Sequence, residues 1–150
     1  MDLDKQENKK KIGVLGGTFD PAHKGHLSIS KEAKKRYDID KIIWAVTKKN
    51  PFKEKSSLSL DKRINFAKKI AKKNSFIKVK YFEDKIKSNR TIDLIKYIKK
   101  NNKKTDIYFI MGADSLINFH KWKKSDLISS ICNILVFDRD RYKAKSLSSR

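Results

Sequence analysis

Residues 16–26, GGTFDPAHKGH, follow directly on the apolar run IGVL at positions 12–15. This run predicts a short buried strand that ends at Gly16 and Gly17. The helix that follows is predicted to open at residues 23–26, HKGH. Two adjacent glycines let backbone N–H groups come close to a phosphate, and a helix N-terminus adds donors and the positive end of its dipole. The stretch therefore predicts an anion-binding turn between a strand and a helix.

Outward from this stretch, apolar runs alternate with amphipathic helical patterns. Continuous apolar runs occupy 42–46, 107–111 and 134–137, and residues 76–82 alternate apolar with basic side chains. Three helices are predicted from apolar residues at helical spacing: Ile29, Ala33 and Tyr37; Leu60, Ile64, Ala67 and Ala71, with Ser59 as N-cap; and Ile92, Ile95 and Ile98. Buried strands separated by helices predict a Rossmann-like α/β fold, with a parallel sheet of about five strands and helices on both faces.

The composition is that of one folded, strongly basic domain. The chain has 150 residues, and 38 Lys and Arg against 17 Asp and Glu give a net charge of +21. We predict a basic tail at 1–11 and a single domain at 12–150. The excess is almost all lysine, so it fits either a solvated surface or a basic face that attracts polyanions. Nucleic acid is not expected as the main partner, because base and phosphate recognition favours arginine.

The number of cysteines and the hydropathy of the sequence indicate in which cellular compartment the protein is expected. The single cysteine, Cys132, lies in an apolar stretch and is expected to be a small core residue. The sequence has no run of about 18 apolar residues and no apolar signal segment. These features predict a reduced, cytoplasmic protein that has no membrane partner.

The stretch at 16–26 resembles the signature of the nucleotidylyltransferase superfamily, and its TFDPxHxGH form is similar to that of bacterial nicotinate-nucleotide adenylyltransferases. Four later segments are similar to patterns of the same family: VTKKNPFK at 46–53, Arg90-Thr91, FIMGADS at 109–115 followed by Lys121-Trp122, and Phe137-Asp138-Arg139. The resemblance extends from about Lys11 to Tyr142. It implies a nucleotidylyltransferase domain of the Rossmann-like type.

The resemblance implies transfer of the adenylyl group of ATP to nicotinate mononucleotide, with Mg²⁺ present and no protein nucleophile. Catalysis would then be positioning and electrostatic stabilisation. His23 and His26 are the expected catalytic donors to the ATP phosphates. The other residues expected to bind ATP are Gly16, Gly17, Thr18, Phe19, Lys24, Gly112, Asp114 and Arg139. Those expected to bind the nicotinate nucleotide are Thr47, Asn50, Arg90, Thr91 and Trp122.

Each of these residues also has a purely structural interpretation. His23 and His26 could be two metal ligands, but no third Cys or His lies nearby in the sequence, so we predict no protein-built metal site. Asp114 or Thr91 could cap a helix, and Trp122 could be core packing. Arg139 could sit in a surface ion pair instead of on a phosphate.

The sequence also departs from the family pattern. Thr47 stands where the family usually has Pro, and Phe52-Lys53 where it has Pro-His. The family's later ISSTxxR-type motif is not found, so the domain is expected to be C-terminally short and weakened in activity. Transfer to another phosphorylated acceptor such as phosphopantetheine, cytidylyl transfer, and a basic nucleic-acid-binding module are the alternatives. Self-association of the chain is left open.

Overall fold

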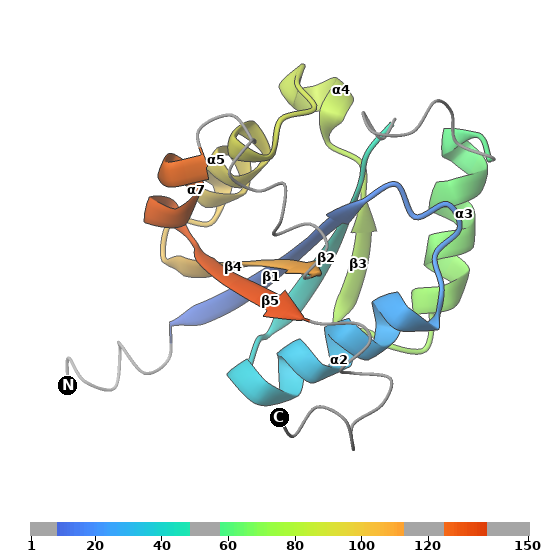
Figure 1. Cartoon of the computed structure of the whole chain (residues 1–150), viewed down its shortest axis with the longest axis horizontal. Helices are drawn as coiled ribbons and strands as arrows, with labels where there is room; N and C mark the ends of the chain where they lie inside the picture. Colours follow the sequence, from blue (N-terminus) through green and yellow to red (C-terminus); the bar gives the residue numbers. More distant parts are fainter. Residues whose placement is uncertain (1–8, 49–57, 113–124, 138–150) are drawn as a thin grey trace.

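The computed structural model describes residues 9–48, 58–112 and 125–137 (Figure 1). Strands and helices alternate along most of this chain. In order they are β1 (Lys10–Gly17), α2 (Lys24–Tyr37), β2 (Lys41–Val46), α3 (Leu60–Ala71), β3 (Ile77–Lys80), α4 (Glu83–Ile86), α5 (Thr91–Asn101), β4 (Thr105–Gly112), α7 (Ser125–Ile131) and β5 (Asn133–Phe137).

The five strands form one parallel sheet in the order β3-β2-β1-β4-β5. β1 is central, with Leu15 opposite Trp44 of β2 on one side and Ile110 of β4 on the other. The chain moves outward from β1 through β2 to β3 and then crosses back to β4, so the strand order reverses between β1 and β4. The carboxyl edge beside such a reversal is where open α/β sheets bind ligands. The predicted fold class is confirmed.

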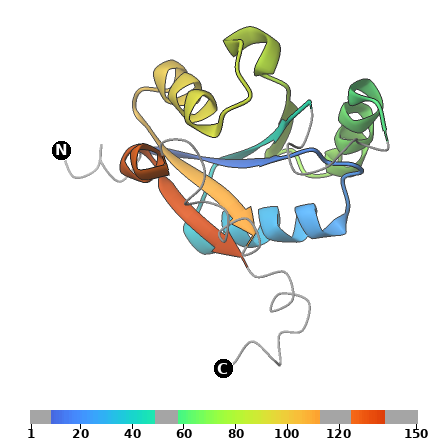
Figure 2. The same cartoon turned by 45° about the horizontal axis from the view of Figure 1, so that its top comes forward.

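Helices cover both faces of the sheet, as Figure 2 shows with α5 above the strands and α2 below. Successive side chains of a strand point to opposite faces, so the sheet carries two apolar layers. Ile42, Trp44 and Val46 join the cluster that packs on α2 and α3. Ile43 and Ala45 join the cluster that packs on α5 and α7. Burial on both faces explains why the strands are continuous apolar runs in the sequence.

Several predicted boundaries are wrong by a few residues. β1 begins at Lys10 instead of Ile12, because Lys10 and Lys11 already pair with Thr105 and Asp106 of β4. β3 covers only 77–80 of the predicted 76–82.

The helical predictions hold with two exceptions. Ile29 and Ala33 are buried as expected, but Tyr37 is 36% exposed at the end of α2. The short helices α4 and α7 were not predicted. Within the described ranges no helix is long and apolar enough to cross a membrane.

Candidate active site

The predicted anion-binding turn lies at the carboxyl end of the central strand. Neither Gly16 nor Gly17 has a positive φ. A Cβ at Gly16 would come no closer than 3.9 Å to another atom, and one at Gly17 would lie 3.7 Å from the Phe19 ring, both ordinary contacts. Packing within the described chain therefore leaves room for a methyl group at both positions. This agrees with the predicted reason for the glycines, close approach of a ligand to the backbone.

The two histidines cap the N-terminus of α2 with their own rings. His23 is the N-cap residue, and its Nδ1 accepts a hydrogen bond from the backbone N–H of Gly25 at 3.0 Å. The Nδ1 of His26 accepts one from the backbone N–H of His23, also at 3.0 Å. An imidazole nitrogen that accepts a hydrogen bond carries no proton, so each neutral ring holds its proton on Nε2. The cap thus fixes the tautomer and orientation of both rings.

Two buried aromatic side chains pack against the ring of His26. The ring of Phe19 is 2% exposed and lies 4.5 Å from the His26 ring and 5.2 Å from the Trp44 ring, centroid to centroid. Trp44 Nε1 donates to Ser30 Oγ at 2.9 Å, and Ser30 Oγ donates to the carbonyl of His26 at 2.8 Å. Phe19 reaches this position with φ of 51°, in the left-handed region. Its side chain therefore supports the histidine, and only its backbone could face a ligand.

The loop after β2 lies beside the loop after β1. The backbone N–H of Thr47 donates to the carbonyl of Gly17 at 2.8 Å, which continues the pairing of the two strands. The backbone N–H of Lys48 donates to Glu83 Oε1 at 3.0 Å. Burial raises the pKa of the Glu83 carboxyl, and the hydrogen bond from Lys48 opposes that shift. Thr47 is thus placed next to the predicted phosphate-binding turn.

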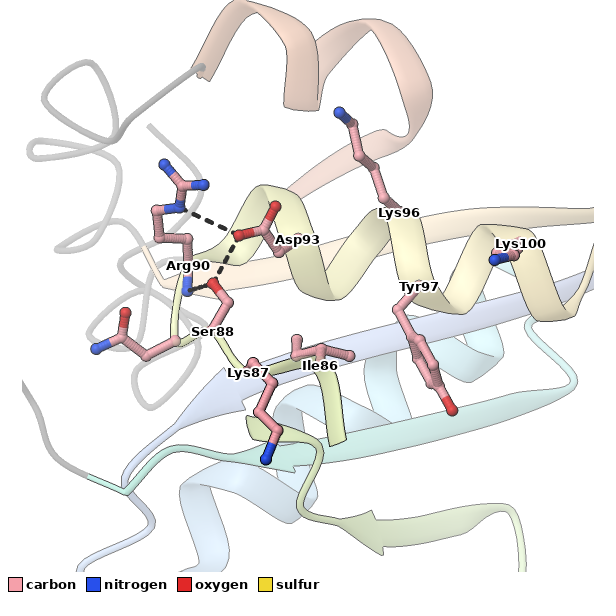
Figure 3. Close-up of a pocket in the computed structure, with 9 residues that line it drawn as sticks. Ile86, Lys87, Ser88, Arg90, Asp93, Lys96, Tyr97 and Lys100 are labelled. Atoms are coloured by element: carbon pink, nitrogen blue, oxygen red, sulfur yellow. Dashed lines mark hydrogen bonds and ion pairs between the residues drawn. The ribbon is translucent and has the colours of Figure 1, made fainter. Parts of the chain in front are cut away.

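Arg90 and Thr91 lie at the N-terminus of α5, which follows β3 and the short α4. Arg90 is the N-cap and Thr91 the first helical residue, so the interpretation of Thr91 as a cap is wrong. Arg90 Nε donates to Asp93 Oδ2 at 3.1 Å, and Ser88 Oγ donates to the same oxygen at 2.6 Å. Figure 3 shows these three side chains turned toward one another on the wall of an open pocket. The bond from Ser88, followed by that from Arg90, lowers the pKa of Asp93.

The remaining predicted site residues divide into two groups. Lys24 is exposed as the first residue of α2, and Gly112 ends β4 opposite Phe137 of β5. Asn50, Asp114, Trp122 and Arg139 lie outside the described residues. Within 9–48, 58–112 and 125–137, no cluster of three or more His, Cys, Asp or Glu side chains could hold a metal ion.

Three residues of this region were missed by the sequence analysis as contributors to the site: Ser30, Trp44 and Arg63. Ser30 and Trp44 are fully buried and act on His26 through hydrogen bonds. Arg63 is 2% exposed on α3, and its guanidinium contacts the carbonyls of Thr18 and Thr47. A local signal existed only for Arg63, which interrupts the apolar face of its helix.

A glycine-containing turn and a helix N-terminus at the reversal of a parallel sheet define a nucleotide-binding α/β protein. A family model described as "Cytidylyltransferase-like" matches residues 14–149. The chain belongs to this family.

Curated relatives and solved structures show which proteins this chain is similar to. A protein of Pelagibacter ubique named "Probable nicotinate-nucleotide adenylyltransferase" is 65% identical over 143 residues, which are 95% of this chain and 79% of that protein. A solved chain from Vibrio parahaemolyticus shares the fold with a TM-score of 0.76 at 19% identity, over 93% of this chain and 80% of its own. The Plasmodium falciparum nicotinic acid mononucleotide adenylyltransferase complexed with NaAD has a TM-score of 0.65 at 19% identity, over 86% and 75%.

Proposed function

We propose that this chain transfers the adenylyl group of ATP to nicotinate mononucleotide, a step of NAD biosynthesis. A phosphate oxygen of nicotinate mononucleotide attacks the α-phosphorus of ATP. The bond from that phosphorus to the oxygen bridging to the β-phosphorus breaks, which gives nicotinate adenine dinucleotide and pyrophosphate. The name of the relative that is 65% identical supports the nicotinate acceptor. The dinucleotide held by the Plasmodium falciparum enzyme supports the product.

The observation that carries the proposal is the pair of histidine rings fixed at the N-terminus of α2. In this reaction negative charge builds up on the oxygen that bridges the α- and β-phosphorus atoms, as pyrophosphate leaves. Preorganised N–H donors stabilise such charge without reorganising during the reaction. The caps hold His23 and His26 with Nδ1 as acceptor, so Nε2–H is the donor that each neutral ring can supply. We assign these two groups to the ATP phosphates.

The other assignments rest on position at the carboxyl edge for the described residues, and on the resemblance of the sequence motifs to the family for Asn50, Asp114, Trp122 and Arg139. The backbone of residues 16–19 and the side chain of Lys24 would contact the triphosphate. Gly112, Asp114 and Arg139 would complete the ATP side, with Asp114 accepting from a ribose hydroxyl. The acceptor side would be formed by Thr47, Asn50, Arg90, Thr91 and Trp122.

The divalent metal of this family belongs with the nucleotide. Mg²⁺ usually keeps several waters and binds to phosphates with few protein ligands. The described residues offer no cluster of three metal-binding side chains, which fits an ion carried by the triphosphate. We therefore propose Mg²⁺–ATP as the substrate, and the cytoplasm, where both nucleotides are available, as the compartment.

The test is release of pyrophosphate from Mg²⁺–ATP, with nicotinate mononucleotide, nicotinamide mononucleotide or phosphopantetheine offered separately. We expect release with nicotinate mononucleotide. Release with phosphopantetheine alone would assign a different acceptor. If no acceptor is used but polynucleotide binds in a strongly salt-dependent way, the basic-module alternative replaces the proposal.

The matched variant is His23→Asn, because Asn is among the best N-cap residues but has no imidazole. We expect its helix content and unfolding midpoint to stay close to those of the parent chain. Its rate of transfer should fall about 100-fold or more, as is typical when a preorganised donor to a transition state is removed. Full activity of the Asn variant would mean that His23 serves only as a cap.

A further inference from the structure

Arg63 is a buried cation whose partners are backbone carbonyls. It projects from α3 and is 2% exposed. None of the ion pairs found in the described parts of the chain includes it. Burying a charge is costly unless hydrogen bonds compensate it, and loss of this cation would leave its buried carbonyl acceptors unpaired. The location of those carbonyls therefore decides which segments Arg63 holds together.

The guanidinium bridges three separate segments. Nη1 donates to the carbonyls of both Thr18 and Thr47, each at 2.8 Å. Nη2 donates to the carbonyl of Lys48 at 2.6 Å, and Nε to that of Leu58 at 3.1 Å. Four carbonyl acceptors from three segments suit the rigid fork of arginine, with its several N–H donors, whereas the single ammonium of lysine presents its donors from one point.

Two of these segments are the loops that carry the two sides of the proposed site. Thr18 precedes Phe19, the ring of which supports His26. Thr47 and Lys48 form the start of the loop after β2, and Lys48 is also held by Glu83 of α4. The guanidinium of Arg63 thus bonds to both loops, one on each side of the proposed site, in addition to the backbone bond from Thr47 to Gly17.

We propose that Arg63 is a positioning residue for adenylyl transfer, which fixes the loop after β1 against the loop after β2 and so aligns the two substrates. This inference rests on the proposed function. An in-line transfer between two bound nucleotides depends on the distance between them, and a misplacement of about 1 Å can cost about 100-fold in rate. Binding of each nucleotide alone depends much less on that distance.

The test compares Arg63→Met with Arg63→Lys and with Arg36→Met as control. Arg36 is an exposed arginine of α2 that pairs with Glu32. For Arg63→Met we expect kcat to fall about 100-fold while the dissociation constant of ATP, measured alone, changes little. Arg63→Lys should fall in the same direction by less, and Arg36→Met should match the parent chain. A parent-like kcat in both Arg63 variants would overturn the inference.

Amide hydrogen exchange supplies a readout that does not depend on turnover. In the Arg63 variants the amides of Thr47 and Lys48 should exchange faster, while those in the middle of β1, β2 and β4 keep their protection. Unchanged exchange in the loop overturns the positioning role even if the enzyme is slow. If Arg63→Met loses protection throughout the chain, it has unfolded. Exchange at Thr47 and Lys48 in Arg63→Lys then decides whether Arg63 holds the loops.

The same experiment separates the two proposals. A parent chain that transfers adenylate to no acceptor defeats the proposed function and the catalytic part of the inference together, and exchange still decides whether Arg63 holds the loops. An active parent with parent-like Arg63 variants defeats only the inference.

Discussion

The thiol of Cys132 follows directly on the last residue of α7 and is half-buried. Its Sγ donates to the carbonyl of Ile128 at 3.3 Å. Burial raises the pKa of the Cys132 thiol to about 11 from an ordinary value of 9.0. The thiolate, not the thiol, reacts with alkylating agents. Cys132 was predicted to be a small core residue; the structure places it partly buried, packed against the cluster beside α5 and α7.

A prediction at this scale concerns the rate of alkylation of Cys132. At pH 8 the folded chain should react with iodoacetamide about 100-fold more slowly than the chain in denaturant, because its thiolate fraction is that much smaller. The folded rate should climb as pH rises toward 11, where the denatured rate has already levelled off. Equal rates at pH 8 would show that burial does not control this thiol.

Other residues of the site show what a linear pattern can and cannot reveal. The turn at 16–26 was predicted because its glycines and histidines are adjacent in the sequence. The burial of Arg63 depends on three loops that meet only in the folded chain, from Thr18, Thr47 and Leu58. Ser30 bonds to His26 four residues earlier in the same helix, but Trp44 reaches Ser30 across 14 residues, a contact that no local spacing encodes.

At the scale of elements, the N-terminal cap of α3 bears on the position of Arg63. Ser59 is its N-cap, and the Ser59 hydroxyl accepts a hydrogen bond from the backbone N–H of Lys62 at 3.3 Å. The sequence predicted this cap from the residue type and the apolar spacing that follows. The cap fixes where the first turn of α3 begins, and Arg63 stands in that turn.

We predict that Ser59→Ala lowers the free energy of unfolding by about 1 kcal/mol, because a backbone N–H at the helix start loses its acceptor. Ser59→Asp should keep the parent value, since aspartate also caps. Ser75→Ala, at an exposed serine ahead of β3, is the control and should be neutral. Urea unfolding measures all three. If Ser75→Ala lowers the free energy of unfolding as much as Ser59→Ala does, loss of the cap is not the cause.

The elements that sequence predicted well are those whose pattern is set by burial. β1, β2 and β4 lie between two helical layers, which accounts for their apolar runs, whereas β5 is an edge strand in which Val136 is 41% exposed. α4 has only four residues, and its N-cap, Phe82, makes no side-chain cap bond, so nothing marks this helix in the sequence. α7 has seven residues, about two helical turns, and so short a window does not let periodicity separate a helix from a loop.

At the scale of the whole molecule the dominant property is the charge of +21. Few of the charged side chains are paired with one another: the described ranges contain three ion pairs, all at least partly exposed. Like charges at this density repel one another and destabilise the compact state. A net positive charge also favours the approach of polyanions from solution.

We predict that sodium chloride stabilises the folded chain. Between about 0.02 and 0.5 M NaCl the Debye length shrinks severalfold, so repulsion among the lysines is screened and the urea midpoint should rise. The control replaces the exposed Lys72, Lys73 and Lys103 by Glu, which lowers the net charge by six. This variant should respond less to salt. A midpoint that falls with salt in the parent chain would contradict the prediction.

The register of the central strand has a consequence for synthesis on the ribosome. β1 pairs first with β2, about 30 residues later, but its other edge waits for β4, with Lys10 opposite Thr105. Until some 95 further residues have been made, the nascent chain therefore carries its central strand with one row of backbone groups unpaired. Open strand edges of this kind invite pairing with other chains. The interval between translation of β2 and of β4 is thus when this edge is open to such pairing.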